Sequence, residues 1–465
     1  MLRKYQVEMI DALRAAIKAG NRRVILVAPT GAGKGTIASQ GIAAPAAARG
    51  HRVLAIAGRL ELINQLAERM PPGSAGIIKA GIKPDRDHLI QVASVQTLVR
   101  RTYPPADIVI TDECHLANAP TYRRIYAEYP DAIHCGLTAS PYRANGCGLG
   151  TDFWQAIVST VDVPTLTAAG HLVPVRTFAP SRPDLSGVHT KGGDYETGEL
   201  AARVAPLVGD IVKTYLKLAA GRQTICFAVN VEHSKELAAQ FLAAGVPAEH
   251  VDGETDAAVR AAALARLASG ETMVVCNCGL FSTGVDVPPV SCVILACPTK
   301  SRVKWRQTAG RGMRPHPGKE SCLLLDHANC SEMHGLISDV EDYTLADDKR
   351  AGPGDDSGPP IRTCPACFAV ILSSAQVCSE CGQAMPASVT RQVQTADGEL
   401  AEVGKSAPKV VRFRMAEHAA LLEMAATARA KGYAAGWIGH QFQKRFGRWP
   451  AGMQQLTSLL RGDPS

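Results

Sequence analysis

The sequence contains no apolar run of about 18 residues, the length that a membrane-spanning helix requires. Its first six residues, Met1 to Gln6, also lack the apolar stretch of a secretory signal peptide. These absences predict a cytoplasmic protein with no membrane partner. The sequence also shows no convincing nuclease constellation, so DNA cleavage would need a partner protein.

The charge and the cysteines are unevenly distributed. From Lys405 onward there are ten Lys/Arg and three Asp/Glu, a surplus of seven that equals the net charge of +7 for the whole chain. Such a basic tail favours a polyanionic partner, although a solvated helical face is the simpler alternative. Of the 14 cysteines, several lie singly in apolar runs, which predicts buried, reduced thiols at Cys226, Cys276, Cys292 and Cys322.

Short apolar runs alternate with helix-like segments through most of the chain, which predicts two tandem α/β domains with parallel sheets. The expected strands are 24–28, 53–57, 90–93, 107–111, 132–138, 224–229, 272–276, 291–296 and 321–325. Prolines and a Gly-Gly pair interrupt the pattern at about 175–200. The predicted domains are 1–175 and 176–345, then a linker 346–362, a cysteine module 363–385, a linker 386–408 and a basic helical domain 409–465.

A glycine-rich loop follows the first expected strand and precedes a helix, as a phosphate-binding loop does. It reads Ala28-Pro29-Thr30-Gly31-Ala32-Gly33-Lys34-Gly35-Thr36. Lys34 is expected to reach the β- and γ-phosphates. The next position usually carries Ser or Thr to help bind Mg²⁺, but here it is Gly35, so Thr36 or a water would take that place. A weakened or lost ATPase is the alternative.

Two acids end a buried strand, where ligands of α/β sheets bind. Asp112 is expected to hold Mg²⁺ and Glu113 to orient or deprotonate the attacking water. Far downstream, Gln307 is followed by Arg311 and Arg314. On a helix that spacing places both guanidinium groups on one face, where they can stabilise a transferring phosphoryl group.

These motifs, in this order, resemble those of superfamily 2 helicases of the DEAD/DEAH-box kind, with a box reading Asp112-Glu113-Cys114-His115. The resemblance implies two RecA-like lobes over about residues 1–330. It implies further nucleotide contacts at Arg3, Tyr5, Gln6, Gly284 and Asp286. It implies nucleic-acid contacts at Arg59, Ser94, Gln96, Thr97 and Thr283. It implies that hydrolysis is coupled to strand movement through His115, Thr138 and Ser140.

Within the superfamily the chain most resembles RadD-like and XPB-like DNA helicases, including versions carried by phages. This implies an ATP- and Mg²⁺-dependent DNA helicase or translocase, acting in repair, recombination or replication. DNA, single-stranded or branched, is the expected partner, with RNA and repair or replication proteins as further candidates. A nucleic-acid-binding protein with a crippled ATPase and a small-molecule phosphotransferase are the alternatives, and a restriction subunit is also conceivable.

Four cysteines form two Cys-x-x-Cys pairs separated by ten residues: Cys364, Cys367, Cys378 and Cys381. Two such pairs predict a structural Zn²⁺ site in a small ribbon, in preference to a redox dithiol. In the tail, helices are expected at 415–430 and 437–446. Basic residues there (Arg412, Arg414, Lys444, Arg445 and Arg448) interleave with aromatic ones (Phe413, Trp437, Phe442, Phe446 and Trp449). This favours DNA binding by stacking, unless the aromatics form the core of a helical domain.

Overall fold

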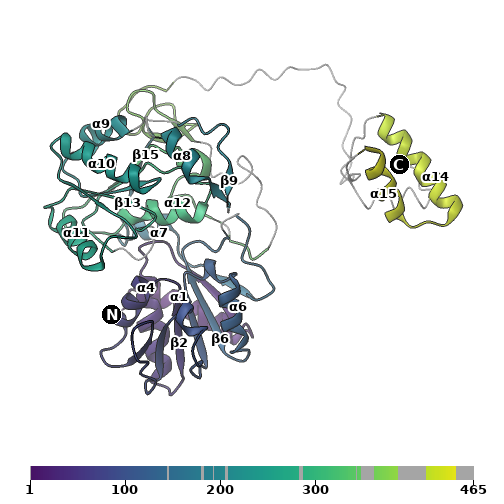
Figure 1. Cartoon of the computed structure of the whole chain (residues 1–465), viewed down its shortest axis with the longest axis horizontal. Coiled ribbons are helices and arrows are strands. Elements are labelled where there is room, and N and C mark those ends of the chain that lie inside the picture. Colours follow the sequence, from purple (N-terminus) through teal and green to yellow (C-terminus); the bar gives the residue numbers. More distant parts are fainter. Residues whose placement is uncertain are drawn as a thin grey trace. The chain divides into compact units, whose positions relative to one another are not determined.

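Two parallel β-sheets organise the first part of the chain (Figure 1). The structure, a computed structural model, describes residues 2–143, 146–179, 183–191, 193–204, 208–281, 286–341, 343–346, 361–385 and 415–446. The chain divides into two units, residues 1–388 and 389–465, and both sheets lie in the first unit.

The first sheet has seven parallel strands in the spatial order β3-β4-β2-β5-β6-β1-β7. The strands are β1 (Arg23–Val27), β2 (Val53–Ala57), β3 (Ala75–Ile78), β4 (Ile90–Ser94), β5 (Ile108–Asp112), β6 (Ile133–Thr138) and β7 (Ala156–Val158). The helices are α1 (Lys4–Lys18), α2 (Lys34–Thr36), the π-helix η1 (Ile37–Ala43), α3 (Ala44–Ala47), α4 (Leu60–Arg69), α5 (Val95–Leu98), the 3-10 turn η2 (Cys114–Leu116), α6 (Pro120–Ala127) and α7 (Val163–Ala168). We call α1 to β7 lobe 1, and α7 lies in the segment that connects it to the second sheet.

Helices cover both faces of this sheet because its strands are apolar on both sides. Along β1, Val24 and Leu26 pack in the same core cluster as Met9 of α1. The alternate residues Ile25 and Val27 pack on the opposite face, in the cluster that contains α6. Figure 1 shows α1 and α4 on one side of the sheet and α6 on the other.

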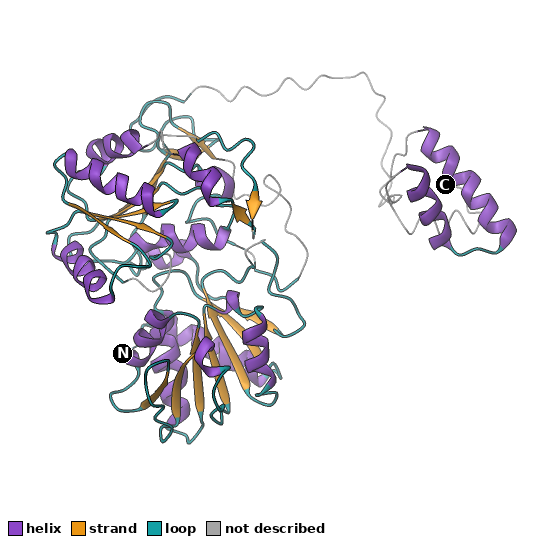
Figure 2. Ribbon diagram, viewed as in Figure 1, coloured by secondary structure: helices purple, strands orange, loops and turns teal. Residues whose placement is uncertain are grey.

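The second sheet has six parallel strands in the order β12-β13-β11-β14-β15-β8. Figure 2 shows the strands of both sheets in orange with purple helices around them. Its strands are β8 (Val175–Phe178), β11 (Thr224–Ala228), β12 (Ala248–Val251), β13 (Val274–Cys278), β14 (Cys292–Leu295) and β15 (Cys322–Asp326), and the hairpin β9 (Thr190–Lys191) and β10 (Asp194–Tyr195) stands apart. The helices are α8 (Thr197–Val204), α9 (Val208–Leu218), α10 (Val231–Ala243), α11 (Ala257–Ser269), α12 (Arg302–Ala309), the 3-10 turn η4 (Gly310–Gly312) and α13 (Cys330–His334). We call β8 to α13 lobe 2.

The two lobes share one continuous apolar core. A single cluster contains Ala28 and Leu172 together with Val293 and Met313 of lobe 2. The backbone N–H of Val173 donates to the carbonyl of Met313 at 2.9 Å, which joins the connecting segment to lobe 2. Lobe 2 meets the carboxyl ends of β1 and β5 with α12 and the turn that follows it.

The cysteine module packs directly on lobe 2. Its strands β16 (Ile361–Thr363) and β17 (Val370–Leu372) form an antiparallel pair. The N–H of Ala179, just after β8, donates to the carbonyl of Phe368 at 2.9 Å. Cys364, Ile371 and Cys378 belong to the same apolar cluster as the strands of lobe 2. The module is thus part of the lobe 2 core, and its first strand begins within the segment that we predicted to be a linker.

The second unit is described from 415 to 446 and contains α14 (Met415–Lys431) and α15 (Ala435–Phe446). Both helices agree with the sequence expectation within a few residues. Phe442 is fully buried between them, and Trp437 and Phe446 pack against the same core. The described aromatics therefore serve as the core of this unit, which was the alternative to base stacking. Arg412, Phe413, Arg414, Arg448 and Trp449 lie outside the described residues.

The two-sheet α/β fold is confirmed, and every expected strand is present to within a few residues. The interruption expected at about 175–200 is wrong at its start, because residues 175–178 form β8, the edge strand beside β15. Among the described residues, no helix is both long enough and apolar enough to cross a bilayer.

Candidate functional site

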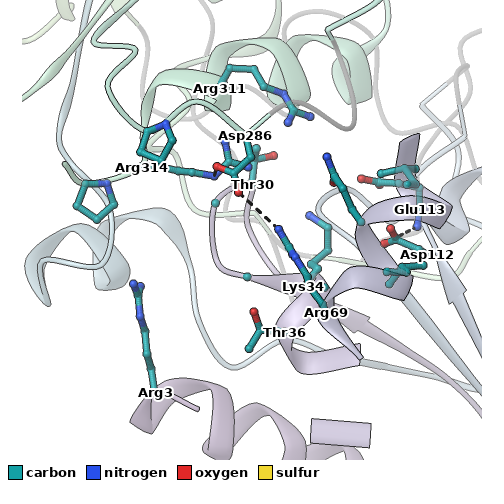
Figure 3. Close-up of a pocket in the computed structure, with 18 residues that line it drawn as sticks. Arg3, Thr30, Lys34, Thr36, Arg69, Asp112, Glu113, Asp286, Arg311 and Arg314 are labelled. Carbon is teal, nitrogen blue, oxygen red and sulfur yellow. Dashed lines mark hydrogen bonds and ion pairs between the residues drawn. The ribbon is translucent and has the colours of Figure 1, made fainter. Parts of the chain in front are cut away.

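A pocket opens where the two lobes meet, and both contribute to it (Figure 3). Lobe 1 contributes the phosphate loop, α4 and the end of β5. Lobe 2 contributes Asp286 and the turn after α12. The lining residues are Arg3, Thr30, Gly31, Gly33, Lys34, Gly35, Thr36, Leu62, Gln65, Leu66, Arg69, Asp112, Glu113, Asp286, Pro288, Arg311, Arg314 and Pro315. The site brings together most of the residues predicted from sequence to contact nucleotide.

The phosphate loop has the backbone that its glycines allow. Gly31 and Gly33 adopt left-handed conformations with φ of 90° and 81°. A Cβ on Gly31 would lie 2.9 Å from Leu172 Cδ2, so side chains are excluded by space as well as by conformation. Lys34 follows as the first residue of α2, and its Nζ lies 3.4 Å from the carbonyl oxygen of Ala28. The ammonium group thus lies over its own loop, where a phosphate chain would bind.

The three nucleotide contacts expected before the first strand lie in different places. Arg3 lines the pocket. Tyr5 and Gln6 are buried behind the loop, and both donate to the carbonyl of Ala32, the tyrosine at 2.9 Å and the glutamine at 3.1 Å. These two side chains therefore fix the shape of the phosphate loop, and only Arg3 faces the ligand space.

Asp112 and Glu113 end β5 and are buried side by side. Burial, and then the charge of Glu113, raises the pKa of Asp112 to about 6. Burial also acts to raise the pKa of Glu113, but Lys34, the hydrogen bond with His115 and Arg311 outweigh it and lower that pKa to about 2. Glu113 is therefore ionised at neutral pH, as a residue that accepts a proton from water must be.

The backbone of Glu113 is left-handed, with φ 50° and ψ 51°, a conformation that is unusual for a non-glycine residue. Such geometry persists only where the surroundings enforce it, and it is frequent at functional sites. Here Gln307 of lobe 2 donates from Nε2 to Glu113 Oε2 at 3.3 Å, and His115 Nδ1 lies 3.2 Å from the same oxygen. The carboxylate is held from both lobes.

The residues expected to couple hydrolysis to movement form a short chain of contacts. His115 Nδ1 lies 3.1 Å from Thr138 Oγ1, and the Thr138 hydroxyl donates to the carbonyl of Ser140 at 3.1 Å. The N–H of Ser140 is also 3.1 Å from Thr138 Oγ1. The end of β6 is thereby connected through His115 to Glu113.

Arg311 and Arg314 both line the pocket, but not from one helix face. The α-helix ends at Ala309, so Arg311 lies on the 3-10 turn η4 and Arg314 in the bend beyond it. A Cβ on Gly310 would lie 2.7 Å from Thr30 Cβ, so this turn rests directly on the phosphate loop. Burial, and then repulsion by Arg314, lowers the pKa of Arg311 to about 9, which leaves it charged at neutral pH.

Asp286 is shared by two arginines. Its Oδ1 lies 3.1 Å from Arg314 Nε, and its Oδ2 lies 3.5 Å from Arg69 Nη2. Arg69 was not anticipated from the sequence, although it lies four residues after Gln65 on the same face of α4. Thr283 and Gly284, expected to contact nucleic acid and nucleotide, lie outside the described residues.

The donor set fits a magnesium ion bound with a nucleotide. Asp112 supplies a carboxylate and Thr36 a hydroxyl, and both line the pocket. Oxygen ligands of this kind, completed by phosphates and water, are what Mg²⁺ requires. Gly35 adds no ligand.

The expected nucleic-acid contacts lie at the carboxyl ends of the neighbouring strands β2 and β4. Arg59 precedes α4, and Ser94 precedes α5, which contains Gln96 and Thr97. Gln96 donates to the carbonyl of Gly58 at 2.9 Å and accepts from the Ser94 hydroxyl at 3.0 Å. The two motifs are thus tied into one surface, which makes them suited to act together.

The four cysteines of the module converge. Sγ atoms of Cys364 and Cys381 lie 3.8 Å apart, those of Cys367 and Cys378 3.7 Å apart, and all four lie within 4.8 Å of one another. Tetrahedral zinc with bonds of about 2.3 Å places its sulfurs about 3.8 Å apart. The geometry therefore fits Zn²⁺ held by four thiolates.

Two protein-family profiles match the chain. One, described as the res subunit of type III restriction enzymes, matches residues 1–143, and the helicase conserved C-terminal domain matches residues 208–316. The chain belongs to the superfamily 2 helicases and is an ATP-hydrolysing enzyme of the helicase type.

The chain is 29% identical over 390 residues to a 51.5 kDa protein of a Lactococcus phage, covering 83% of each chain. It is also 29% identical to a Saccharomyces cerevisiae protein named "Putative ATP-dependent helicase IRC3", over 73% of this chain and 53% of the relative. A second yeast relative, from Schizosaccharomyces pombe, bears the same type of name, is 28% identical and is covered over 60% of its length. The chain thus spans little more than half of these two yeast relatives.

Two solved structures share the fold. A fragment of an HsdR subunit of a type I restriction enzyme from Vibrio vulnificus has a TM-score of 0.55 at 21% identity, over 72% of this chain and 67% of that one. The restriction-modification enzyme LlaBIII, solved bound to DNA, has a TM-score of 0.53 at 16% identity, over 70% of this chain and 27% of that one. At these identities the likeness concerns the fold alone.

Proposed function

We propose that this helicase is a DNA helicase or translocase that binds ATP in the pocket between its lobes. The observation that carries the proposal is the pocket itself, which is lined by Lys34 and Asp112 from lobe 1 and by Arg311 and Arg314 from lobe 2. A nucleotide bound there contacts both lobes, so hydrolysis can change how the lobes are held together.

In the proposed mechanism the phosphate loop and Lys34 bind the phosphates of ATP. Asp112 and Thr36 would hold a magnesium ion bound with the nucleotide, and that ion would supply positive charge beside the phosphates. Glu113 is ionised and held by Gln307 and His115, so it can orient the attacking water and accept its proton. Arg311 and Arg314 stabilise the charge on the transferring group, and they leave it when the lobes separate.

The proposed DNA path runs over Arg59, Ser94, Gln96 and Thr97, with Thr283 as a contact from lobe 2. Because backbone phosphates supply most of the contacts in such proteins, we expect slight sequence preference and strong salt dependence. The DNA-bound state of the related fold in LlaBIII supports DNA as the partner. The chain from His115 to Thr138 and Ser140 would carry the state of the nucleotide site to the end of β6.

The proposed cellular role is in DNA repair, recombination or replication. There the protein would bind branched or single-stranded DNA and act with repair or replication proteins. The finer resemblance to RadD-like and XPB-like helicases supports this role, as does the basic tail. The zinc ribbon would act as a structural part of lobe 2, since Cys364 and Cys378 lie in that core.

Phosphate release from ATP tests the proposal directly, measured with single-stranded, duplex and forked DNA and with RNA alongside. We expect stimulation by DNA, and we expect Lys34→Ala to abolish turnover while the fold remains intact. Normal ATP turnover by the Lys34→Ala variant would contradict the proposal that the chain is an ATP-driven helicase or translocase. Absence of turnover with every nucleic acid would favour the alternative, a binding protein whose ATPase is weak or lost because of Gly35.

A motor component of a restriction system is a second candidate. The match of residues 1–143 to the res subunit of type III restriction enzymes favours it. Because we identify no nuclease site, we expect the chain alone to leave DNA uncut in the presence of ATP and Mg²⁺. Site-specific cleavage appearing only when a partner protein is added would favour this candidate over repair.

A further inference from the structure

Position 35, which has no side chain, lies directly against the side chain of Arg69. Gly35 lies within α2, and its backbone does not have the positive φ seen at Gly31 and Gly33, so conformation does not require glycine here. A Cβ at position 35 would collide with Arg69 Nη1 and would lie 3.1 Å from Arg69 Cδ and 3.2 Å from Arg69 Cζ. The guanidinium of Arg69 therefore occupies the place where phosphate loops usually carry a hydroxyl side chain.

Arg69 is held loosely in that place. Its side chain is 36% exposed, and its ion-pair partner Asp286 is 3.5 Å away. Asp286 also pairs with Arg314 at the shorter distance of 3.1 Å. An exposed and long ion pair contributes little free energy. Arg69 can therefore exchange Asp286 for a stronger anionic partner without a large penalty.

The pocket has an excess of positive charge that such a partner would balance. Five cationic side chains line it: Arg3, Lys34, Arg69, Arg311 and Arg314. Three carboxylates line it: Asp112, Glu113 and Asp286. Figure 3 shows Arg69 beside Lys34 and Thr36, pointing into the space between the phosphate loop and the lobe 2 residues. A phosphate chain held by Lys34 would lie next to the guanidinium.

We propose that Arg69 is a phosphate-binding residue of this site. In the nucleotide complex its guanidinium releases Asp286 and donates hydrogen bonds to phosphate oxygens, with the two-pronged geometry that arginine offers to phosphate. Gly35 keeps that position open, so the two residues form a functional pair. The ligand is a nucleoside di- or triphosphate, and the inference rests on the proposed nucleotide site.

Binding of ADP and of adenosine to the full-length chain tests the inference. Arg69→Ala should weaken ADP binding by about tenfold or more, as the loss of a charge-assisted hydrogen bond does, and should leave adenosine binding unchanged. Arg69→Lys should give an intermediate affinity, because lysine keeps the positive charge but lacks the two-pronged hydrogen-bonding geometry of the guanidinium. The matched control Arg49→Ala removes an exposed guanidinium of lobe 1 outside the pocket, and ADP affinity should not change.

Lys34→Ala separates failure of this inference from failure of the proposed function. Weak ADP binding by Lys34→Ala together with unchanged binding by Arg69→Ala would overturn the inference alone. Unchanged ADP binding by both variants would overturn the nucleotide site as well, and the inference with it.

Gly35→Ser provides a second arm, in which the effect of one substitution is compared with Arg69 present and with Arg69 absent. With Arg69 present, the new side chain must displace the guanidinium, and ADP binding should fall. In the Arg69→Ala background that space is free, so the same substitution should have much less effect. Such non-additivity is expected for two residues in contact. Equal effects of Gly35→Ser in both backgrounds would contradict the pairing.

Discussion

Replacing Glu341 by alanine should strongly destabilise lobe 2. Its side chain is 1% exposed, and Oε1 lies 2.6 Å from Arg302 Nε and 3.0 Å from Arg306 Nε, both on α12. Removing one partner of a buried ion pair costs about 3–5 kcal/mol because the remaining charge stays desolvated. Arg306 is 8% exposed and cannot reach water easily, whereas Arg302 is 19% exposed and can regain part of its hydration. We therefore expect the lower end of that range, about 3 kcal/mol.

The consequence extends to lobe 1 because the chain returns there just after Glu341. Tyr343 and Leu345 pack against the lobe 1 core, and the N–H of Gly150 donates to the Leu345 carbonyl at 2.9 Å. Urea unfolding monitored by tryptophan fluorescence is a suitable assay, since Trp305 is buried in α12 between the two arginines. Glu320→Ala, at an exposed site of lobe 2, should change the unfolding free energy by less than about 0.5 kcal/mol. A change below about 1 kcal/mol for Glu341→Ala would refute the reasoning.

Two other predictions concern the zinc site and the response to acid. Cys378→Ser should release zinc and increase hydrogen exchange in both residues 361–385 and β8, because the ribbon lies in the lobe 2 core. If metal analysis finds no zinc bound to the parent chain, the zinc ribbon is contradicted. Burial lowers the pKa of His134 from 6.5 to about 4, so the unfolded chain binds a proton more readily and stability is lost as pH falls from 6.5 towards 4. His134→Gln should remove about 1.4 kcal/mol of the loss in unfolding free energy between pH 7.5 and pH 5.5, and an unchanged loss would show that His134 does not contribute to it.

The parts of the site that the sequence predicted are those carried by contiguous motifs. The phosphate loop and Asp112-Glu113 each follow an expected strand, and parallel strands bring their carboxyl ends to one edge. The spacing of the two Cys-x-x-Cys pairs predicts a four-cysteine metal site, and the structure brings the four sulfurs together as that spacing predicts. The superfamily resemblance, which rests on the order of such motifs, is confirmed. Its finer RadD-like and XPB-like placement remains a prediction.

The parts that the sequence did not predict depend on packing between distant segments. Gly35 and Arg69 meet only because α4 passes over α2, and nothing in either local sequence signals that contact. The helix expected to carry both Arg311 and Arg314 ends at Ala309, and the 3-10 turn that follows packs closely on lobe 2. A Cβ on Gly312 would collide with Cys322 Sγ and lie 3.2 Å from Val293 Cγ2, a contact between segments that the local sequence does not reveal. The strand β8 was missed because prolines flank it at Pro174 and Pro180, although it is long enough to pair with β15.

The rate of DNA-stimulated phosphate release by Arg311→Ala at saturating ATP tests the central claim most directly. If lobe 2 stabilises the transferring phosphoryl group through this side chain, turnover should fall by on the order of 10³-fold, while ADP binding, anchored mainly on Lys34, changes far less. Turnover within a few-fold of the parent chain would mean that the pocket is not closed by lobe 2 during hydrolysis, and the two-lobe account would be contradicted.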